Sequence, residues 1–226
     1  MTTDRRPLTL FTQSRNSAGE RVRIALNLKA LSYEYVSVAA MDAAEYRRIN
    51  PQGLMPALKV GEEMIAQSGA ILEYLEEVYP GRPLLPANPI ARAQARAFAC
   101  LIAADTHPLC NYRVRTYLVQ ELNASDAAVL AWYRNWVTTS FASLEEVLAR
   151  RPSASAYCFG DSPGWADLHL VPMVENARRF QCDLSAFPHL LEIEGRCSRL
   201  EAFRQARPDA QPDYPGYVKM TVGPGR

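Results

Sequence analysis

A proline-rich stretch from Pro80 to Pro89 divides this sequence into two parts with different patterns. Proline restricts the backbone dihedral φ, so four prolines in ten residues are typical of a stiff connection between domains. Before this stretch, short β-prone runs alternate with helical patterns, whereas every long pattern after it is helical. We therefore predict an α/β domain over residues 1–80, a linker over residues 81–89 and an all-α domain over residues 90–226.

The first part follows the order strand, helix, strand, then strand, strand, helix. Its strand patterns are short, and they cover residues 8–11, 33–38, 56–60 and 64–66. Helical patterns cover residues 21–29 and 69–78, and Ser68 is placed to cap the second. Asn50-Pro51-Gln52-Gly53 is a turn cluster.

The second part holds four helical patterns, over residues 90–121, 126–151, 166–180 and 190–204. The tail from Pro208 to Arg226 is rich in proline and glycine, so we expect it to be loosely ordered.

Composition and charge exclude several classes of function. Hydrophobic residues make up 48% of the chain and charged residues 22%, the balance of a globular protein rather than a disordered one. The net charge is only +1, unlike the basic footprint of a nucleic-acid-binding protein. No apolar run approaches the roughly 20 residues of a membrane-spanning helix, and no apolar signal core follows Met1. We expect a cytoplasmic protein that binds neither nucleic acid nor membranes.

The cysteines and histidines form no recognisable metal-binding or disulfide pattern. The five cysteines are scattered and include no Cys-x-x-Cys pair, and the three histidines are dispersed. We therefore expect buried free thiols and no metal site.

A polar loop, Ser14 to Arg21, precedes and opens the first helical pattern. Backbone N–H groups at a helix start can hold an anion, and the hydroxyl of Ser17 could donate a hydrogen bond to a thiolate there. An ordinary helix N-cap is the simpler interpretation of the same residues.

Three further features also allow two interpretations. A cis bond at Met55-Pro56 would expose the preceding backbone to a peptide-like ligand, although most X-Pro bonds are trans. Gln67-Ser68 could hold an α-carboxylate, or Ser68 could only cap its own helix. Asp167 follows Gly164 by three residues, the spacing of a capping box, and we interpret it as structural.

In combination, these features resemble the cytosolic glutathione transferases, and most closely the zeta class, which includes maleylacetoacetate and maleylpyruvate isomerases. The resemblance covers residues 8–213. The segments that carry it are Arg21–Lys29, Asn50–Leu58, Gln67–Glu77, Leu84-Leu85-Pro86, His107-Pro108 with Asn111, Ala166-Asp167, Leu170-Val171-Pro172, Ala177–Phe180 and Gln211-Pro212-Asp213. It implies a thioredoxin-like N-terminal domain, an all-helical C-terminal domain and a homodimer.

The resemblance also implies a glutathione site on the thioredoxin-like half. Met55 would bond the cysteinyl part through its main chain, with Pro56 cis, while Gln67 and Ser68 would hold the γ-glutamyl carboxylate. Gln52 would lie nearby, and Asn111 would contribute from the helical half.

Near the thiol, the zeta-class pattern is Ser-Ser-Cys-x-aromatic, followed by Arg-Val-Arg. Here those five places are filled by Asn16, Ser17, Ala18, Gly19 and Glu20. Maleylpyruvate isomerases also lack the cysteine, whereas a carboxylate at Glu20 opposes the ionisation of a nearby thiol. The candidate catalytic residues are Arg15, Asn16 and Ser17.

The implied reaction is the cis–trans isomerisation of a diketo dicarboxylic acid from aromatic catabolism. A glutathione thiolate adds to the activated double bond, rotation follows about the resulting single bond, and elimination returns the thiolate. The enzyme must stabilise a thiolate and an enolate and bind two carboxylates, for which arginine is suited.

Arginines at three positions stand where the maleylpyruvate branch is also basic. We expect these residues, Arg15, Arg113 and Arg179, to hold the substrate. His107 and Tyr112 would join them, although Tyr112 replaces an arginine of that branch. Without the resemblance, each arginine fits an ordinary solvated helix face.

Two alternatives remain open. One is a general glutathione transferase that conjugates small electrophiles such as an α-halo acid. The other is a non-catalytic protein of the same fold that binds glutathione, which the loss of the cysteine and the presence of Glu20 would suit.

Overall fold

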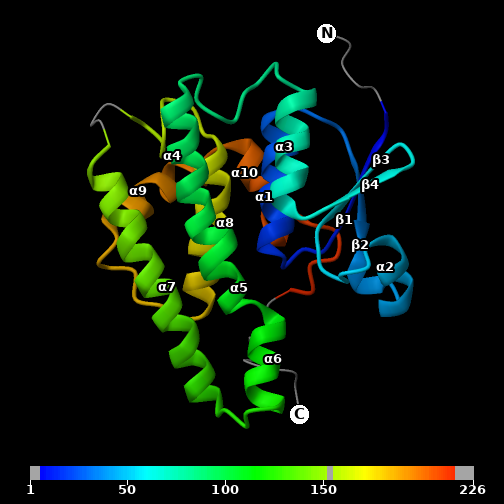
Figure 1. Ribbon diagram of the computed structural model, residues 1–226, viewed down its shortest axis with the longest axis vertical. Helices are drawn as coiled ribbons and strands as arrows, with labels where there is room; N and C mark the ends of the chain where they lie inside the picture. Colours follow the sequence, from blue (N-terminus) through cyan, green and yellow to red (C-terminus); the bar gives the residue numbers. More distant parts are fainter. Residues whose placement is uncertain (1–5, 152–154, 217–226) are drawn as a thin grey trace. The chain divides into compact units, whose positions relative to one another are not determined.

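The computed structural model describes residues 6–151 and 155–216 (Figure 1). Their contacts divide into two compact units. The first unit comprises residues 6–85 and 198–216, and the second comprises residues 86–151 and 155–197. We predicted one helical domain for everything after residue 90, but residues 198–216 pack with the α/β part. Helical periodicity does not report which core a segment joins.

The first unit is built on a four-stranded mixed sheet in the order β2-β1-β3-β4. The strands are β1 (Leu8–Thr12), β2 (Glu34–Ser37), β3 (Ala57–Val60) and β4 (Glu63–Ala66). β1 pairs parallel with β2 and antiparallel with β3, and β3 and β4 form a hairpin. All four predicted strands are confirmed, within one residue at each end.

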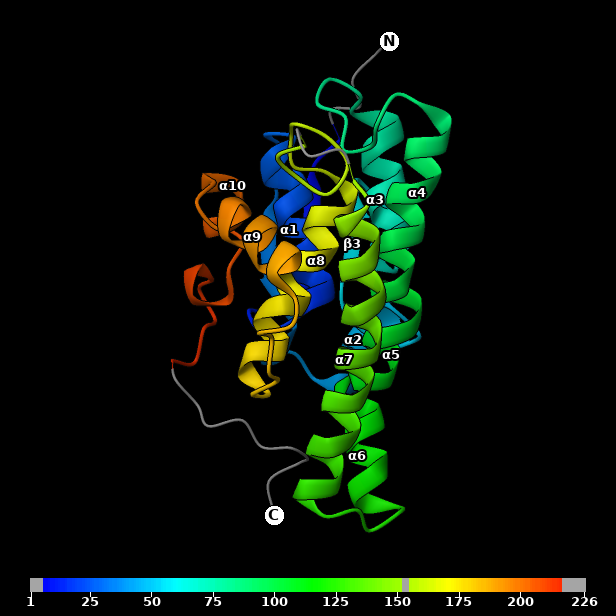
Figure 2. The same ribbon diagram turned by 90° about the vertical axis from the view of Figure 1, so that its left-hand side faces the viewer.

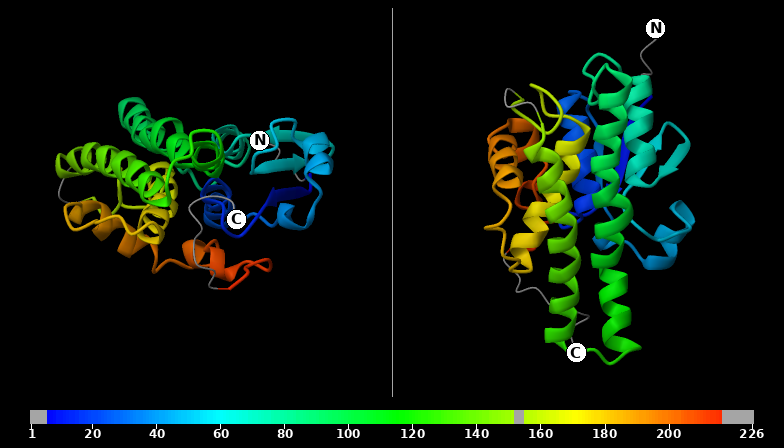
Figure 3. Two further views of the ribbon diagram at one scale, coloured as in Figure 1. Left: turned by 90° about the horizontal axis from the view of Figure 1, so that it is seen from below. Right: turned by 60° about the vertical axis from the view of Figure 1, so that its left-hand side comes forward.

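Two helices, α1 (Ser17–Leu28) and α3 (Ser68–Val78), lie on one side of this sheet, and α2 (Ala43–Ile49) lies on the other (Figures 1 and 3). α1 and α3 contact each other and bury apolar side chains such as Val22 and Leu75. α1 begins four residues before the predicted helix because Asn16 caps it. We did not predict α2 or the short 3-10 turn η1 (Val38–Ala40). α2 buries only Tyr46, so it leaves little helical periodicity in the sequence.

The second unit is helical. Its elements are α4 (Pro89–Cys100), η2 (Leu101–Thr106), α5 (His107–Cys110), α6 (Tyr112–Gln120), α7 (Asp126–Ala149), α8 (Trp165–Arg179) and α9 (Pro188–Cys197). α7 returns beside the column of α5 and α6, and α8 contacts both α4 and α9 (Figures 2 and 3).

Our prediction of one helix over residues 90–121 is wrong, because that segment is interrupted twice. Residues Leu101–Thr106 form a π-helical turn shortly before Pro108. Proline lacks an N–H, and its ring would clash with the carbonyl four residues earlier, which a wider turn relieves. Asn111 then adopts an extended backbone and caps α6. The predicted helix over residues 190–204 likewise ends at Cys197, and α10 (Glu201–Arg204) and the 3-10 turn η3 (Pro208–Ala210) follow in the first unit.

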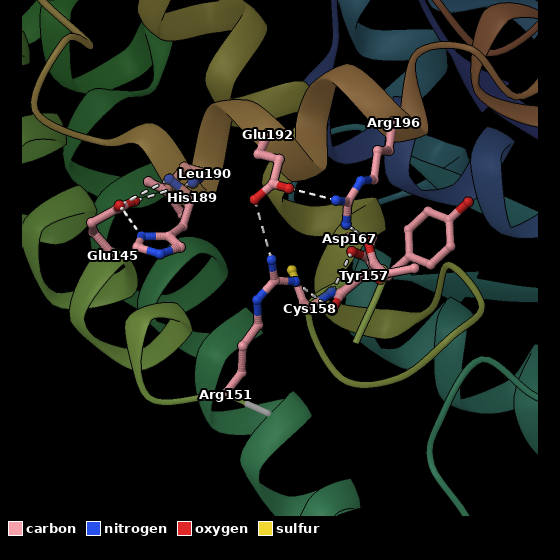
Figure 4. A network of polar contacts seen from close by, with 10 residues as sticks. Glu145, Arg151, Tyr157, Cys158, Asp167, His189, Leu190, Glu192 and Arg196 are labelled. Atoms are coloured by element: carbon pink, nitrogen blue, oxygen red, sulfur yellow. Dashed lines mark hydrogen bonds and ion pairs between the residues drawn. The ribbon is translucent and has the colours of Figure 1, made fainter. Parts of the chain in front are cut away.

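Asp167 forms the predicted capping box at the start of α8 (Figure 4). Its carboxylate accepts hydrogen bonds from the backbone N–H groups of Gly164 at 2.8 Å and Cys158 at 3.0 Å. Burial raises the pKa of this carboxyl above its ordinary value, and the hydrogen bonds only partly oppose that rise. The structural interpretation of Asp167 is therefore confirmed.

A carboxylate from α7 caps α9 in the same region (Figure 4). Glu145 accepts from the backbone N–H groups of His189 at 2.9 Å and Leu190 at 3.1 Å, and its Oε1 lies 2.5 Å from Nδ1 of His189. The start of α9 is thus fixed by a side chain from a neighbouring helix.

All five cysteines are free. Three are buried, as expected, but Cys182 is half-buried and Cys100 is exposed. Burial raises the pKa of Cys182 to about 11 and that of Cys110 to about 12, so both are unreactive thiols at neutral pH. Within the described ranges, no cluster of three or more His, Cys, Asp or Glu side chains could hold a metal ion, and no helix has the length and apolar character to cross a membrane.

Candidate active site

Three segments that carry predicted site residues leave the sheet at the same edge. Phe11 of β1 pairs with Ala57 of β3, and Ala57 pairs with Ala66 of β4. Because these neighbouring strands are antiparallel, the end of β1, the start of β3 and the end of β4 lie side by side. The loop after Thr12, the Met55-Pro56 bond and Gln67 therefore lie together at one edge of the sheet.

Asn16 and Ser17 form the start of α1. The backbone of Asn16 is extended, and its Oδ1 accepts from the N–H of Gly19 at 2.5 Å, so the simple N-cap interpretation holds for Asn16. Ser17 is the first helical residue and is buried. Its hydroxyl therefore lies where helix N–H groups and the helix dipole favour an anion. Gly19 permits a close approach, since a Cβ there would lie 2.0 Å from Oγ1 of Thr12.

The charge of Glu20 is balanced by two arginines on the same helix. Glu20, Arg21 and Arg23 are all buried. Burial lowers the pKa of Arg21 to about 10, and the negative charge of Glu20 opposes this lowering. Burial likewise lowers the pKa of Arg23, again opposed by Glu20. Arginine is effectively always protonated in proteins, so two positive charges accompany Glu20 and the start of α1 is not a net acidic environment for a thiolate.

Arg15 contacts the C-terminal segment of the first unit. Its Nη2 donates to the backbone oxygen of Gly216 at 2.5 Å, and its guanidinium lies 5.2 Å from the centre of the Tyr214 ring. The role of Arg15 in holding substrate stays a prediction.

The backbone before Met55 is held by side-chain hydrogen bonds. Nδ2 of Asn50 and the hydroxyl of Tyr46 donate to the backbone oxygen of Leu54 at 2.5 and 2.9 Å. The Met55-Pro56 bond is cis, as the resemblance implied.

Gln67 and Ser68 lie at the start of α3, but their arrangement differs from our prediction. Gln67, and not Ser68, occupies the cap position, with a φ of 71° in the left-handed region that non-glycine residues rarely adopt. Such residues often cluster at ligand-binding sites. Nε2 of Gln67 donates to Oε1 of Gln52 at 2.5 Å, which links two predicted ligand-binding residues.

The start of α3 fits the carboxylate of a γ-glutamyl group. Within the described chain, Gln67 makes no side-chain cap hydrogen bond, and the first turn contains no acidic residue. The helix N–H groups are therefore not capped by the side chain at that position, and nothing acidic in the first turn repels an anion. The role of Gln52, Gln67 and Ser68 in holding glutathione stays a prediction.

The remaining predicted residues lie in the second unit. His107 begins α5, and Asn111 caps α6 by accepting from the N–H of Val114 at 3.1 Å. Tyr112 and Arg113 begin α6 and are exposed. Arg179 ends α8, and its Nη1 donates to Oδ1 of Asn176 at 3.2 Å.

Arg115, which we did not predict, links two of these positions. Its guanidinium lies 4.7 Å from the centre of the Phe180 ring and 5.7 Å from that of the Tyr112 ring. Burial lowers the pKa of Arg115, and the positive charge of Arg179 lowers it further. Tyr112 and Arg179 are thus brought near one buried cation. The sequence indicates only the contact between Arg115 and Tyr112, because side chains three residues apart on a helix are neighbours.

Comparisons with known proteins identify the family of this chain. Residues 12–83 match the family described as "Glutathione S-transferase, N-terminal domain". The chain is 43% identical to a maleylpyruvate isomerase of Ralstonia sp over 212 residues, which cover 91% of this chain and 99% of that protein.

Two solved structures are also similar. One is a holo structure of a maleylpyruvate isomerase, a bacterial zeta-class glutathione transferase, with a TM-score of 0.88, 42% identity and coverage of 91% of this chain and 99% of that one. The other is a maleylacetoacetate isomerase from Methylobacterium extorquens AM1 with bound malonate and glutathione. Its TM-score is 0.87 and its identity 39%, and the match covers 92% of this chain and 99% of that one.

Proposed function

This chain belongs to the zeta class of the glutathione transferase family, and we propose that it is a glutathione-dependent cis–trans isomerase of maleylacetoacetate or maleylpyruvate. The predicted fold class, a thioredoxin-like half followed by a helical half, is confirmed. The observation that carries the function is the meeting of the loop around Ser17, Met55-Pro56 and Gln67-Ser68 at one edge of the sheet.

Bound glutathione supplies a thiolate nucleophile that can add to, and leave from, an activated double bond. Gln52, Gln67 and Ser68 would hold its γ-glutamyl carboxylate, and the backbone of Met55 would bond its cysteinyl part. Ser17 would donate a hydrogen bond to the sulfur at the start of α1, with Asn16 fixing the helix start. This placement lowers the pKa of a thiol by stabilising its charged form.

Recognition of the diacid is assigned to arginines and to two further polar side chains. Arg179 and Arg113 would bind carboxylates, and His107 and Tyr112 would contact the rest of the substrate. The charge of Arg115 beside Arg179 favours a dianionic ligand over a neutral one. Asn111 caps α6 through its side-chain Oδ1, and its side-chain NH2 would donate to glutathione.

The test of this function follows the absorbance of maleylpyruvate and of maleylacetoacetate with and without reduced glutathione. Isomerisation without net thiol loss is expected. Stoichiometric thiol loss on an electrophile, with neither diacid isomerised, would indicate a conjugating transferase. Binding of glutathione without turnover of either kind would indicate a binding protein.

A matched pair of serine variants assigns the chemistry to the site. Ser17→Ala is expected to lower kcat about tenfold or more, because one hydrogen bond to a charged group is lost. Ser143→Ala, on the exposed side of α7, is the control and is expected to change nothing. We further propose that the protein is cytoplasmic and that it forms a homodimer. Light scattering after size-exclusion chromatography would test the homodimer.

A further inference from the structure

The segment of residues 205–216, which we call the C-terminal clasp, returns to the loop before α1. Gln211 folds it by donating from Nε2 to the backbone oxygens of Gln205 at 2.7 Å and Arg207 at 2.8 Å. Our expectation that the tail is loosely ordered is therefore wrong for residues 208–216, and the rest of that tail lies outside the described residues.

Asp213 is the centre of this clasp. Its Oδ1 accepts from the backbone N–H of Ser14 at 3.1 Å and from the hydroxyl of Tyr35 at 2.8 Å. Its Oδ2 accepts from the hydroxyl of Ser37 at 2.6 Å. The backbone oxygen of Asp213 also accepts from the hydroxyl of Ser14 at 3.4 Å. One carboxylate thus joins the loop to the neighbouring strand β2.

Arg23 holds the same loop from α1. Its Nη1 and Nη2 donate to the backbone oxygens of Gln13 at 3.2 Å and Ser14 at 3.1 Å, and its Nε donates to that of Ala206 at 2.9 Å. A buried cation therefore binds the loop carbonyls, while Asp213 binds the N–H of Ser14. Two opposite charges fix the backbone two residues before the Asn16 cap.

We propose that Asp213 is a positioning residue, which holds the loop of residues 13–16 so that Asn16 and Ser17 present the start of α1 to the glutathione sulfur. This inference rests on the proposed function. Asp213 touches neither sulfur nor substrate in this role, and it acts through Ser14. Asp213 thus holds the loop of residues 13–16 although it lies 199 positions after Ser14 in the sequence.

The test compares Asp213→Asn with two control variants and, as a rescue, with Asp213→Glu. Asp213→Asn keeps the shape of the side chain but removes its charge and one acceptor. Asp209→Asn, on the exposed turn η3, is the control for loss of an acidic group in the same segment. Asn27→Ala is the control for stability, because it removes only the hydrogen bond to the backbone oxygen of Ala202, outside the clasp.

Three measurements are made on the full-length protein. Hydrogen exchange of the ligand-free protein reports on the amide of Ser14. The pH dependence of thiolate absorbance reports on the pKa of bound glutathione. Steady-state kinetics separate kcat from KM for the diacid. Asp213→Asn should speed exchange at Ser14 about tenfold, raise the thiol pKa by about one unit and lower kcat about tenfold, with a smaller change in KM. Asp213→Glu should recover part of each change.

Both controls are expected to leave the thiol pKa and kcat unchanged, although Asn27→Ala should lower Tm. If Asp213→Asn lowers Tm as Asn27→Ala does but leaves the thiol pKa unchanged, the positioning role is overturned. If the unaltered protein binds glutathione but isomerises neither diacid, only the proposed function fails, since exchange and thiol pKa still test Asp213. If it does not bind glutathione, both proposals fail.

Discussion

Lys29 and Glu76 form a buried ion pair, with Nζ of Lys29 at 2.9 Å from Oε2 of Glu76. Lys29 also donates to the backbone oxygens of Tyr79 and Arg82, and Glu76 accepts from the N–H groups of Leu84 and Leu85. The pair therefore joins α1 and α3 to the proline-rich segment that follows α3. The carboxylate of Glu76 satisfies the N–H groups of Leu84 and Leu85, which would otherwise be buried without hydrogen bonds.

Removing one member of this pair should be worse than removing both. Lys29→Met leaves a buried carboxylate without its cation, and we expect it to lower the free energy of unfolding by about 3–5 kcal/mol. The double variant Lys29→Met/Glu76→Leu should recover part of that loss. Urea denaturation measures both, and the exposed pair Arg150 and Glu146 supplies the control. A double variant no more stable than Lys29→Met would contradict this interpretation.

Glu20→Gln should have opposite effects on stability and on the thiol. Loss of the carboxylate lowers the pKa of Arg21 further and leaves two buried guanidinium groups less compensated, so we expect a loss of about 2 kcal/mol or more in stability. The same loss should lower the pKa of bound glutathione, because a nearby negative charge disappears. Thermal unfolding and thiolate absorbance measure the two effects. Glu63→Gln, at an exposed position, is the control. An unchanged or higher thiol pKa would show that the charge of Glu20 does not act on the sulfur.

Neighbouring arginines at the end of α8 should separate binding from stability. Arg179→Ala is expected to raise KM for the diacid about tenfold or more while leaving KM for glutathione nearly unchanged. Arg178 pairs with Glu194 at 2.7 Å, so Arg178→Ala should reduce stability slightly and leave both KM values unchanged. Equal losses for diacid and glutathione in Arg179→Ala would remove that residue from the substrate site.

Asp167→Ala should destabilise the second unit by about 1–3 kcal/mol, because the N–H groups of Gly164 and Cys158 lose their acceptor. Asp167→Asn should cost less. Its amide oxygen can still accept one of the two hydrogen bonds, and a neutral side chain avoids the cost of burying a charge. Calorimetry of the two variants gives the order. A smaller loss for alanine than for asparagine would show that the hydrogen bonds contribute little.

Acid should weaken the C-terminal clasp. Burial acts to raise the pKa of Asp213, but hydrogen bonds from Ser37, Tyr35 and Ser14 outweigh it and hold the pKa below its ordinary value of 3.8. A carboxyl with a depressed folded-state pKa contributes stability above its unfolded-state pKa and loses it as the pH falls through the folded value. Stability should therefore fall more steeply below about pH 4 in the unaltered protein than in Asp213→Asn. Denaturant titrations on both sides of that pH, with Asp209→Asn retaining the steep fall, measure the difference.

Local patterns were sufficient for the sheet and for most helices. Strand β1 alternates buried and half-buried residues, and Asp167 lies at capping-box spacing, so each could be predicted from adjacent residues. The break around Pro108 was missed because apolar periodicity continues across it while the backbone does not. The start of α1 was placed too late because Asn16, and not a residue next to Arg21, makes the cap.

The candidate site could be predicted only where it consists of short segments. Gln67-Ser68 and Met55-Pro56 are each two residues long, and the resemblance to a family placed them. The link between Arg115 and Phe180 joins different helices, and the bond from Asp213 to Ser14 spans most of the chain. No local pattern encodes such contacts, since they depend on how the elements pack.

The return of residues 198–216 to the first unit has a consequence for biosynthesis. A ribosome releases residues 6–85 long before the segment that contains Asp213, and the whole helical unit is made in between. In the nascent α/β part, the loop before α1 therefore lacks its hydrogen bond to Asp213 until residue 213 has been synthesised. Premature termination in the helical part would yield chains that contain every strand of the sheet yet lack the piece that secures this loop.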